Sequence, residues 1–83
     1  MNKIELIELI AKAKKERETN LDLSGREIVE LPPEIGFLQN LREIDLSSNL
    51  LTELPKELSK LSKLTRINIS RNRLTAFPQV ITS

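Results

Sequence analysis

The polar side chains with the most regular spacing in this chain recur every 23 residues and could supply ion pairs or cation ligands. Two such series run through the chain: Asn20, Glu43 and Arg66, and, two positions later in each case, Asp22, Asp45 and Asn68. A carboxylate beside an arginine forms an ion pair, as we expect for Glu43 with Arg66 and for Asp45 with Arg66 or Arg71. Adjacent Asp22 and Asp45 would be half of a cation site, but a hard cation needs about six or more oxygen ligands. The spacing therefore favours a solvated, partly paired recognition face.

The chain lacks the residue types that most enzymes use. It contains no histidine and no cysteine, which excludes Ser-His-Asp and Cys-His nucleophilic sites and metal sites with histidine or thiolate ligands. Its two glycines, Gly25 and Gly36, belong to no phosphate-binding loop, and no G-x-x-x-x-G-K-[ST] sequence occurs. We therefore expect no enzymatic activity, no cofactor and no bound metal.

The same period governs the apolar residues that must position these polar series. Residues 41–55 align with residues 64–78, and an earlier copy has matching residues at Leu21, Leu23, Ile28, Leu31 and Pro32. Each copy is too small to bury its own apolar edge, so the copies must stack on one another. The pattern L-x-x-L-x-L-x-x-N-x-L at this period is the signature of leucine-rich repeats and predicts an α/β solenoid of about three repeats.

Each repeat is predicted to begin with a short strand, at residues 20–24, 43–47 and 66–70. Alternation directs one set of side chains into the core: Leu21, Leu23, Ile44, Leu46, Ile67 and Ile69. Strands that follow one another in the same direction form a parallel sheet on the concave side, with neighbours about 4.8 Å apart. The outward residues then form columns that we predict to bind a protein partner: Asn20, Asp22, Ser24, Glu43, Asp45, Ser47, Ser48, Arg66, Asn68, Ser70 and Arg71.

Asn49 and Asn72 occupy the turn that follows the strand, and we assign them a structural role. An inward asparagine can satisfy backbone amide and carbonyl groups that a sharp turn would leave unpaired, and stacked repeats would connect these bonds into a ladder. The first repeat has Arg26 at this place. A terminal repeat without an upstream neighbour is expected to depart from the pattern in this way.

The remaining segments are predicted to be helical. Residues 32–40 and 55–63 carry apolar residues three positions apart, which suits a short helical or 3₁₀ turn with proline at its first position. Residues 2–17 predict a longer helix with Asn2 as N-cap and Glu5 completing a capping box. Its apolar side would cover the open edge of the first strand. A membrane-surface helix is the alternative, and the lack of Trp and Phe in this segment disfavours it.

Composition favours an intracellular chain. The absence of cysteine excludes disulfides and fits a reducing compartment. The N-terminal segment lacks the uninterrupted apolar run and cleavage site of a signal peptide, and no apolar run approaches the roughly 20 residues that cross a bilayer. The formal net charge of +1 gives no general attraction to nucleic acid or membrane. We expect a cytoplasmic location and a protein as partner.

The third repeat has no closing cap in the sequence. Leu74, Phe77 and Ile81 would belong to an apolar layer with nothing stacked on it, and such a patch beside an open strand edge favours association. The chain is then either the start of a longer protein or a unit that pairs with a second copy about a two-fold axis. Residues 50–83 carry six Lys or Arg against two Asp or Glu, and this positive charge opposes close contact between two copies.

The repeats resemble the 23-residue class of intracellular, Ras-associated leucine-rich-repeat proteins, whose units end in Leu-Pro-x-x-[Leu/Ile]. Residues 6–13, 19–25 and 31–36 resemble the opening of prokaryotic Roco proteins, in which a capping helix precedes the repeats. The GTPase module of those proteins is absent from these 83 residues, so no nucleotide-binding residue is carried over. The resemblance implies protein recognition or intramolecular docking by the concave face.

These patterns predict one domain, residues 1–83, made of a cap helix and three repeats with the boundaries 1–18, 19–40, 41–63 and 64–83. The predicted function is the binding of a protein partner through the concave face. Two alternatives stay open: a purely structural role as the N-terminal cap of a longer array, and self-association through the third repeat.

Overall fold

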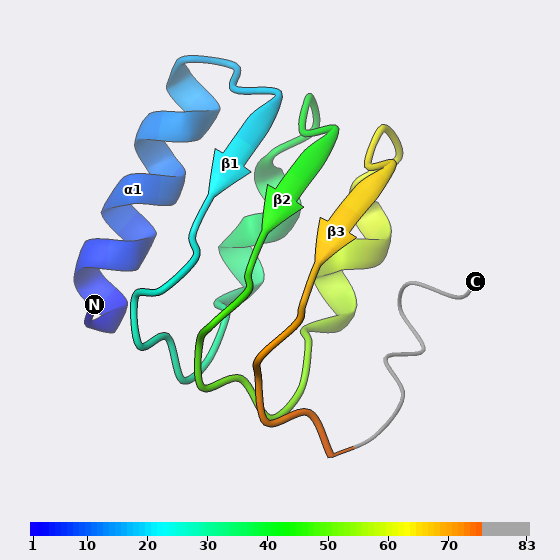
Figure 1. Cartoon of the computed structure of the whole chain (residues 1–83). Coiled ribbons are helices and arrows are strands. Elements are labelled where there is room, and N and C mark those ends of the chain that lie inside the picture. Colours follow the sequence, from blue (N-terminus) through cyan, green and yellow to red (C-terminus); the bar gives the residue numbers. More distant parts are fainter. Residues whose placement is uncertain (76–83) are drawn as a thin grey trace.

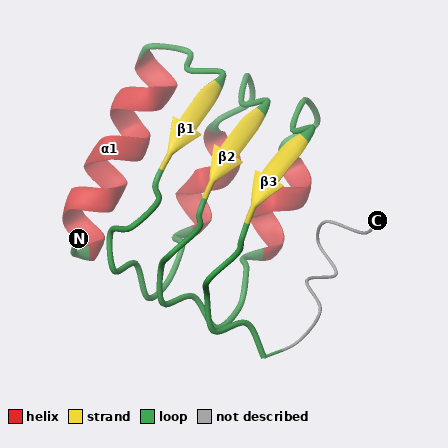
Figure 2. Ribbon diagram, viewed as in Figure 1, coloured by secondary structure: helices red, strands yellow, loops and turns green. Residues whose placement is uncertain are grey.

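The computed structural model describes residues 1–75, and its elements follow one another from one end of the molecule to the other (Figure 1). In chain order they are α1 (Lys3–Lys15), β1 (Asn20–Asp22), the 3₁₀ helix η1 (Pro33–Phe37), β2 (Glu43–Asp45), the 3₁₀ helix η2 (Lys56–Lys60) and β3 (Arg66–Asn68). The strands form one parallel sheet in the order β1-β2-β3, and the 3₁₀ helices lie behind it (Figure 2). The predicted short leucine-rich-repeat solenoid with an N-terminal cap is confirmed.

The register of the sheet repeats the 23-residue period of the sequence. Asp22 lies opposite Asp45 in the β1–β2 pair, and Asp45 lies opposite Asn68 in the β2–β3 pair. Residues of one sequence series therefore stand side by side across the strands, about 4.8 Å apart. The polar columns predicted from the sequence follow directly from this register.

Each strand ends two residues earlier than predicted. The side chain of Asp22 accepts a hydrogen bond from the backbone N–H of Ser24, and Gly25 then has a φ of +61°, which turns the chain out of the strand. Backbone hydrogen bonds between the repeats nevertheless continue beyond the strand end, from Leu23 N to Asp45 O at 2.8 Å. The stack is therefore held by a longer ladder than the strands alone provide.

Aliphatic side chains from α1 and from the repeats share one core. Leu23 and Leu46 are both 0% exposed, as expected for inward positions of the first two repeats. Ile69, the equivalent residue of the third repeat, packs against the same core but is only partly buried. Core positions are therefore less buried in the third repeat, which has no further repeat packed against it within residues 1–75.

Helix α1 begins and ends on well-defined caps. Asn2 Oδ1 accepts from Glu5 N at 2.8 Å while Glu5 Oε1 accepts from Asn2 N, so the predicted capping box is confirmed. At the other end Arg17 adopts a φ of +53°, and Glu18 N donates to Ala13 O at 3.0 Å, which is a Schellman motif. Leu6 is one of the helix residues that enter the core, and α1 lies beside β1 as its cap (Figure 1).

The 3₁₀ helices pack closely against each other on the convex side. The two prolines predicted at the first helical position, Pro32 and Pro55, are instead the N-caps of η1 and η2, and the helices begin one residue later. A Cβ atom added at Gly36 would lie 3.1 Å from both the Cβ and the carbonyl oxygen of Glu57. Glycine at this position therefore lets two successive repeats approach one another.

Candidate functional site

A shallow hollow of about 330 Å³ lies over all three strands, on the side of the sheet turned away from the core. Its lining residues come from β1, β2 and β3: Asn20, Leu21, Asp22, Glu43, Ile44, Asp45, Arg66 and Asn68. Both polar series that the sequence singles out therefore converge on one surface. The other predicted contact residues are placed nearby but do not line the hollow: Ser24, Ser47, Ser48, Ser70 and Arg71.

In each repeat the polar residue of the series Asp22, Asp45 and Asn68 accepts hydrogen bonds from the serine two positions later. Asp45 Oδ1 accepts hydrogen bonds from Ser47 N at 2.9 Å and from Ser47 Oγ at 2.6 Å, and Asp22 holds Ser24 at the same two distances. Asn68 Oδ1 accepts the equivalent pair from Ser70, at 3.1 and 2.8 Å. A carboxylate and a neutral amide therefore accept the same pair of hydrogen bonds from the serine at the end of the strand.

Hydrogen bonding lowers the pKa of Asp22 below its ordinary value of 3.8. The largest cause is the hydrogen bond from the Ser24 hydroxyl, and the bond from the Ser24 backbone N–H comes next. Arg26 adds a weaker attraction, and its Nη2 donates to the Asp22 carbonyl oxygen at 3.3 Å. Asp22 therefore presents a stable negative charge to the hollow at neutral pH.

An ion pair joins two residues of the other polar series, Asn20, Glu43 and Arg66. Arg66 Nη1 lies 3.8 Å from Glu43 Oε1, with side chains that are 77% and 43% exposed, so the predicted pairing of these two residues is confirmed. The further predicted pairs, Asp45 with Arg66 or with Arg71, were wrong, because neither contact forms within 4.0 Å. The Ser47 bonds hold Asp45, and Arg66 leans toward Glu43 instead. An exposed pair of this kind contributes about 0.2–1 kcal/mol.

The turn beyond β2 is built around the side chain of Asn49, which is only 3% exposed. Asn49 Oδ1 accepts from the backbone N–H groups of Arg26 and Ile28, at 3.0 Å each. Its Nδ2 donates to Leu23 O at 2.8 Å and to Leu46 O at 3.0 Å. Because Arg26, Ile28 and Leu23 belong to the preceding repeat, one asparagine joins two repeats.

Asn72 makes the corresponding contacts one repeat later. Its Nδ2 donates to Leu46 O at 2.8 Å, and its Oδ1 accepts from Leu51 N at 3.0 Å. The residues just before the two asparagines, Ser48 and Arg71, have φ values of +58° and +57°, matching Gly25 in the first repeat. This left-handed backbone conformation places Ser48 and Arg71 in the turn after the strand, outside the lining of the hollow.

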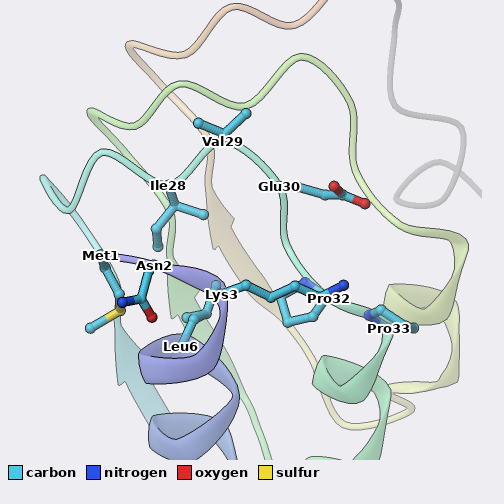
Figure 3. A pocket seen from close by; sticks show the side chains of 9 residues that line it. All are labelled: Met1, Asn2, Lys3, Leu6, Ile28, Val29, Glu30, Pro32 and Pro33. Carbon is cyan, nitrogen blue, oxygen red and sulfur yellow. The ribbon is translucent and has the colours of Figure 1, made fainter.

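A second hollow, of about 280 Å³, was not predicted from the sequence. It lies between the start of α1 and the segment that follows β1, and Figure 3 shows its lining: Met1, Asn2, Lys3, Leu6, Ile28, Val29, Glu30, Pro32 and Pro33. The available signal in the sequence was Val29, an apolar residue outside the core positions of the repeat, and its side chain is 65% exposed in the structure. Of the residues predicted for self-association, Leu74 is partly buried, and Phe77 and Ile81 lie outside the described residues.

The match to a protein-family model agrees with this geometry. The family model for leucine rich repeats matches residues 19–74, the stretch that contains the whole sheet and both 3₁₀ helices. A solved leucine-rich-repeat protein of Leptospira interrogans is 30% identical, with a TM-score of 0.48; the match covers 86% of this chain and 24% of that protein, so this chain spans about a quarter of its length. No curated protein matches the sequence significantly. The chain belongs to the leucine-rich repeat family, whose domains generally mediate protein–protein interactions.

Proposed function

We propose that this chain is a non-enzymatic module that binds a partner protein through the concave face of its sheet, and that it acts in the cytoplasm. The observation that carries the proposal is the hollow over the three strands, where Asp22, Glu43, Asp45, Arg66 and Asn68 gather on exposed or half-buried positions. The residues that hold the fold, such as Asn49, face inward and are buried.

The composition of the site supports binding without chemistry. The sequence supplies no histidine or cysteine, and within residues 1–75 no three Asp or Glu side chains group closely enough to hold a metal ion. The same residues include no helix long and apolar enough to span a membrane. Partner recognition would therefore depend on charge pairing and shape.

Charge reversal on the concave face tests the proposal. Asp45→Lys and Arg66→Glu should each abolish capture of the partner from extracts of the source cells, because each replaces an attraction by a repulsion. Lys56→Glu and Lys60→Glu change exposed charges on η2, on the convex side, and are the matched controls. If the concave and convex variants capture the same proteins as the unchanged chain, the proposal fails.

A second candidate function, stacking, is favoured by the incomplete burial of the third repeat. Ile67, Ile69 and Leu74 are only partly buried, whereas Ile44 and Leu46 in the second repeat are 2% and 0% exposed. Three short strands also offer less than the roughly 800 Å² that each side of a stable interface usually buries. This supports the view that residues 1–83 form one capped domain within a longer, Roco-type array or pair with a second copy.

Sedimentation at tens of micromolar separates these possibilities. Pairing with a second copy predicts a dimer, and Ile69→Asp or Leu74→Asp should return it to a monomer. A unit that continues into a longer array predicts a monomer whose third repeat gains stability when the following residues are added. A monomer unaffected by those residues would contradict both forms of stacking.

A further inference from the structure

We infer that two copies of this chain pair through the second hollow, with Val29 of each copy inserted into the hollow of the other. The inference goes beyond the proposed function, because the second hollow shares no lining residue with the hollow over the three strands. The same surface is used twice, and the two contacts are related by a two-fold axis. A dimer formed in this way leaves the concave face of both copies free.

The second hollow combines an apolar floor with an exposed apolar side chain at its side. Leu6 of α1 and Ile28 of the first repeat are 2% and 1% exposed and line the hollow together with Val29, which is 65% exposed. Figure 3 shows Ile28 between Val29 and the first turn of α1. A two-fold contact fits this arrangement, because each copy must supply both the inserted side chain and the space that receives it.

The other repeats show that the fold does not require apolar residues on this surface. In the 23-residue period Val29 is equivalent to Thr52 and Thr75, and Pro33 is equivalent to Lys56, which begins η2 as Pro33 begins η1. All five side chains are exposed. The chain therefore has apolar residues at these positions only in the repeat that meets α1. Exposed apolar residues at positions that are otherwise polar indicate a surface that another molecule covers.

The charges of the second hollow favour a second copy as that molecule. Lys3 and Glu30 line the hollow and are exposed, and neither forms an ion pair within residues 1–75. About a two-fold axis, Lys3 of each copy can meet Glu30 of the other, so the surface complements itself in charge. The third repeat lacks this property. The charged residues of β3 and of the turn after it are all positive and would repel their own copies: Arg66, Arg71 and Arg73.

The contact should be weak and mainly apolar. Nine residues line the hollow, fewer than the roughly 20–30 residues that each side of a standard interface contributes. Exposed ion pairs contribute little, so insertion of Val29 should supply most of the affinity. We therefore expect a dimer dissociation constant of about 100 μM to 1 mM.

Sedimentation equilibrium and NMR of the untagged chain test the pairing, from tens of micromolar to about one millimolar. We expect monomer and dimer in exchange, with backbone amide shifts that change with concentration at residues 1–6 and 28–33 and not at residues 66–74. Ile69→Asp, which tests pairing through the third repeat, should leave this dimer intact. A chain that stays monomeric throughout, or shifts confined to the third repeat, would overturn the inference.

Substitutions taken from the second repeat locate the contact. Val29→Thr with Pro33→Lys introduces the residues that the second repeat has at these positions, so the fold should be kept, as circular dichroism would show. The double variant should dimerise roughly tenfold or more weakly, the effect expected when apolar residues at the centre of a contact are lost. Thr52→Val places the same exposed side chain outside the second hollow and should leave dimerisation unchanged. A folded double variant that dimerises like the unchanged chain would show that the inference is wrong.

A charge exchange tests the two-fold geometry. Lys3→Glu or Glu30→Lys alone places like charges opposite each other and should weaken the dimer roughly threefold or more. Lys3→Glu keeps the helix, because an acidic residue is favourable in the first turn. The two changes together should restore the dimer, since each contact again joins opposite charges. A combined variant as weak as the single variants would contradict this geometry. The proposed function is tested separately, by partner capture with Asp45→Lys and Arg66→Glu.

Discussion

Asn49 donates a hydrogen bond of 2.8 Å from its side-chain amide to the carbonyl oxygen of Leu23, 26 residues earlier in the chain. Asn72 repeats this bond at the same distance with Leu46. One side chain per turn therefore connects each repeat to the one before it, where a sharp loop would otherwise leave backbone groups unpaired. This connection keeps the strands in register, and the register in turn creates the polar columns of the concave face.

The asparagine ladder predicts a clear order of stability losses. Asn49→Ala leaves the amides of Arg26 and Ile28 and the carbonyl of Leu23 without partners, and it should cost about 3 kcal/mol or more in the free energy of unfolding. Asn72→Ala should cost about 1–2 kcal/mol, because Asn72 is more exposed and water can replace its contacts. Urea unfolding measures both. Equal losses, or a loss below about 1 kcal/mol for Asn49→Ala, would contradict this role.

The lowered pKa of Asp22 predicts a pH-dependent effect of Ser24→Ala. The hydrogen bond from the Ser24 hydroxyl is the largest cause of the lowered pKa, so its loss should raise the pKa of Asp22 toward 3.8. A carboxyl NMR titration measures this change. Because the folded-state pKa is depressed, the associated stability is present above the unfolded value and is lost as pH falls through the folded value. Ser24→Ala should therefore destabilise the chain at neutral pH and progressively less at low pH.

Ser70→Ala is the matched control for that experiment. Ser70 makes the same two bonds to Asn68, whose amide does not titrate. Its substitution should lower stability by an amount that does not change between pH 7 and pH 3. A loss with the same pH dependence in both variants would show that the Asp22 carboxylate is not the group responsible.

Core positions are less buried in the third repeat than in the second, so truncating equivalent core side chains should lower the free energy of unfolding by different amounts. Leu46→Ala, at a position with 0% exposure, should cost about 3 kcal/mol. Ile69→Ala, at the equivalent but partly buried position, should cost about 1 kcal/mol. Denaturant unfolding at several protein concentrations measures both values. A loss for Ile69→Ala that grows with concentration would instead indicate that another copy covers the third repeat.

The two glycines predict losses of different origin. Gly25 has a φ of +61° and open space around its missing Cβ, so Gly25→Ala should cost about 1 kcal/mol through backbone conformation alone. Gly36→Ala would place a Cβ 3.1 Å from the carbonyl oxygen of Glu57 and should cost about 1–3 kcal/mol by pushing the two 3₁₀ helices apart. Thermal unfolding measures both, and a near-neutral Gly36→Ala would contradict the close packing of these helices.

The period predicted most of the fold because it fixes two things at once. Residues 23 positions apart must occupy equivalent places, so the parallel order of the strands and the alignment of Asp22, Asp45 and Asn68 follow without further information. The cap of α1 was also predictable, since Asn2 and Glu5 satisfy each other locally. Such features depend on nearest neighbours in sequence or on the repeat itself.

Features that depend on side-chain competition were less predictable. The sequence offered Asp45 two arginine partners, but Ser47 holds its Oδ1 at 2.6 Å, and Arg66 contacts Glu43 instead. Side-chain hydrogen bonding also explains why the strands end earlier than predicted. The bond from Ser24 N to Asp22 and the left-handed residue that follows, Gly25, turn the chain out of the strand. The hollow beside Val29 arises from the way α1 meets the first repeat, which no sequence period encodes.

Site-specific photo-crosslinking tests the central claim most directly. A benzophenone side chain placed at Asn20, in the lining of the hollow, should form a covalent product with a partner protein in the source cells. The same group at Lys60, exposed on the convex side, should not form that product. Products that appear only from Lys60, or equally from both positions, would contradict recognition through the concave face.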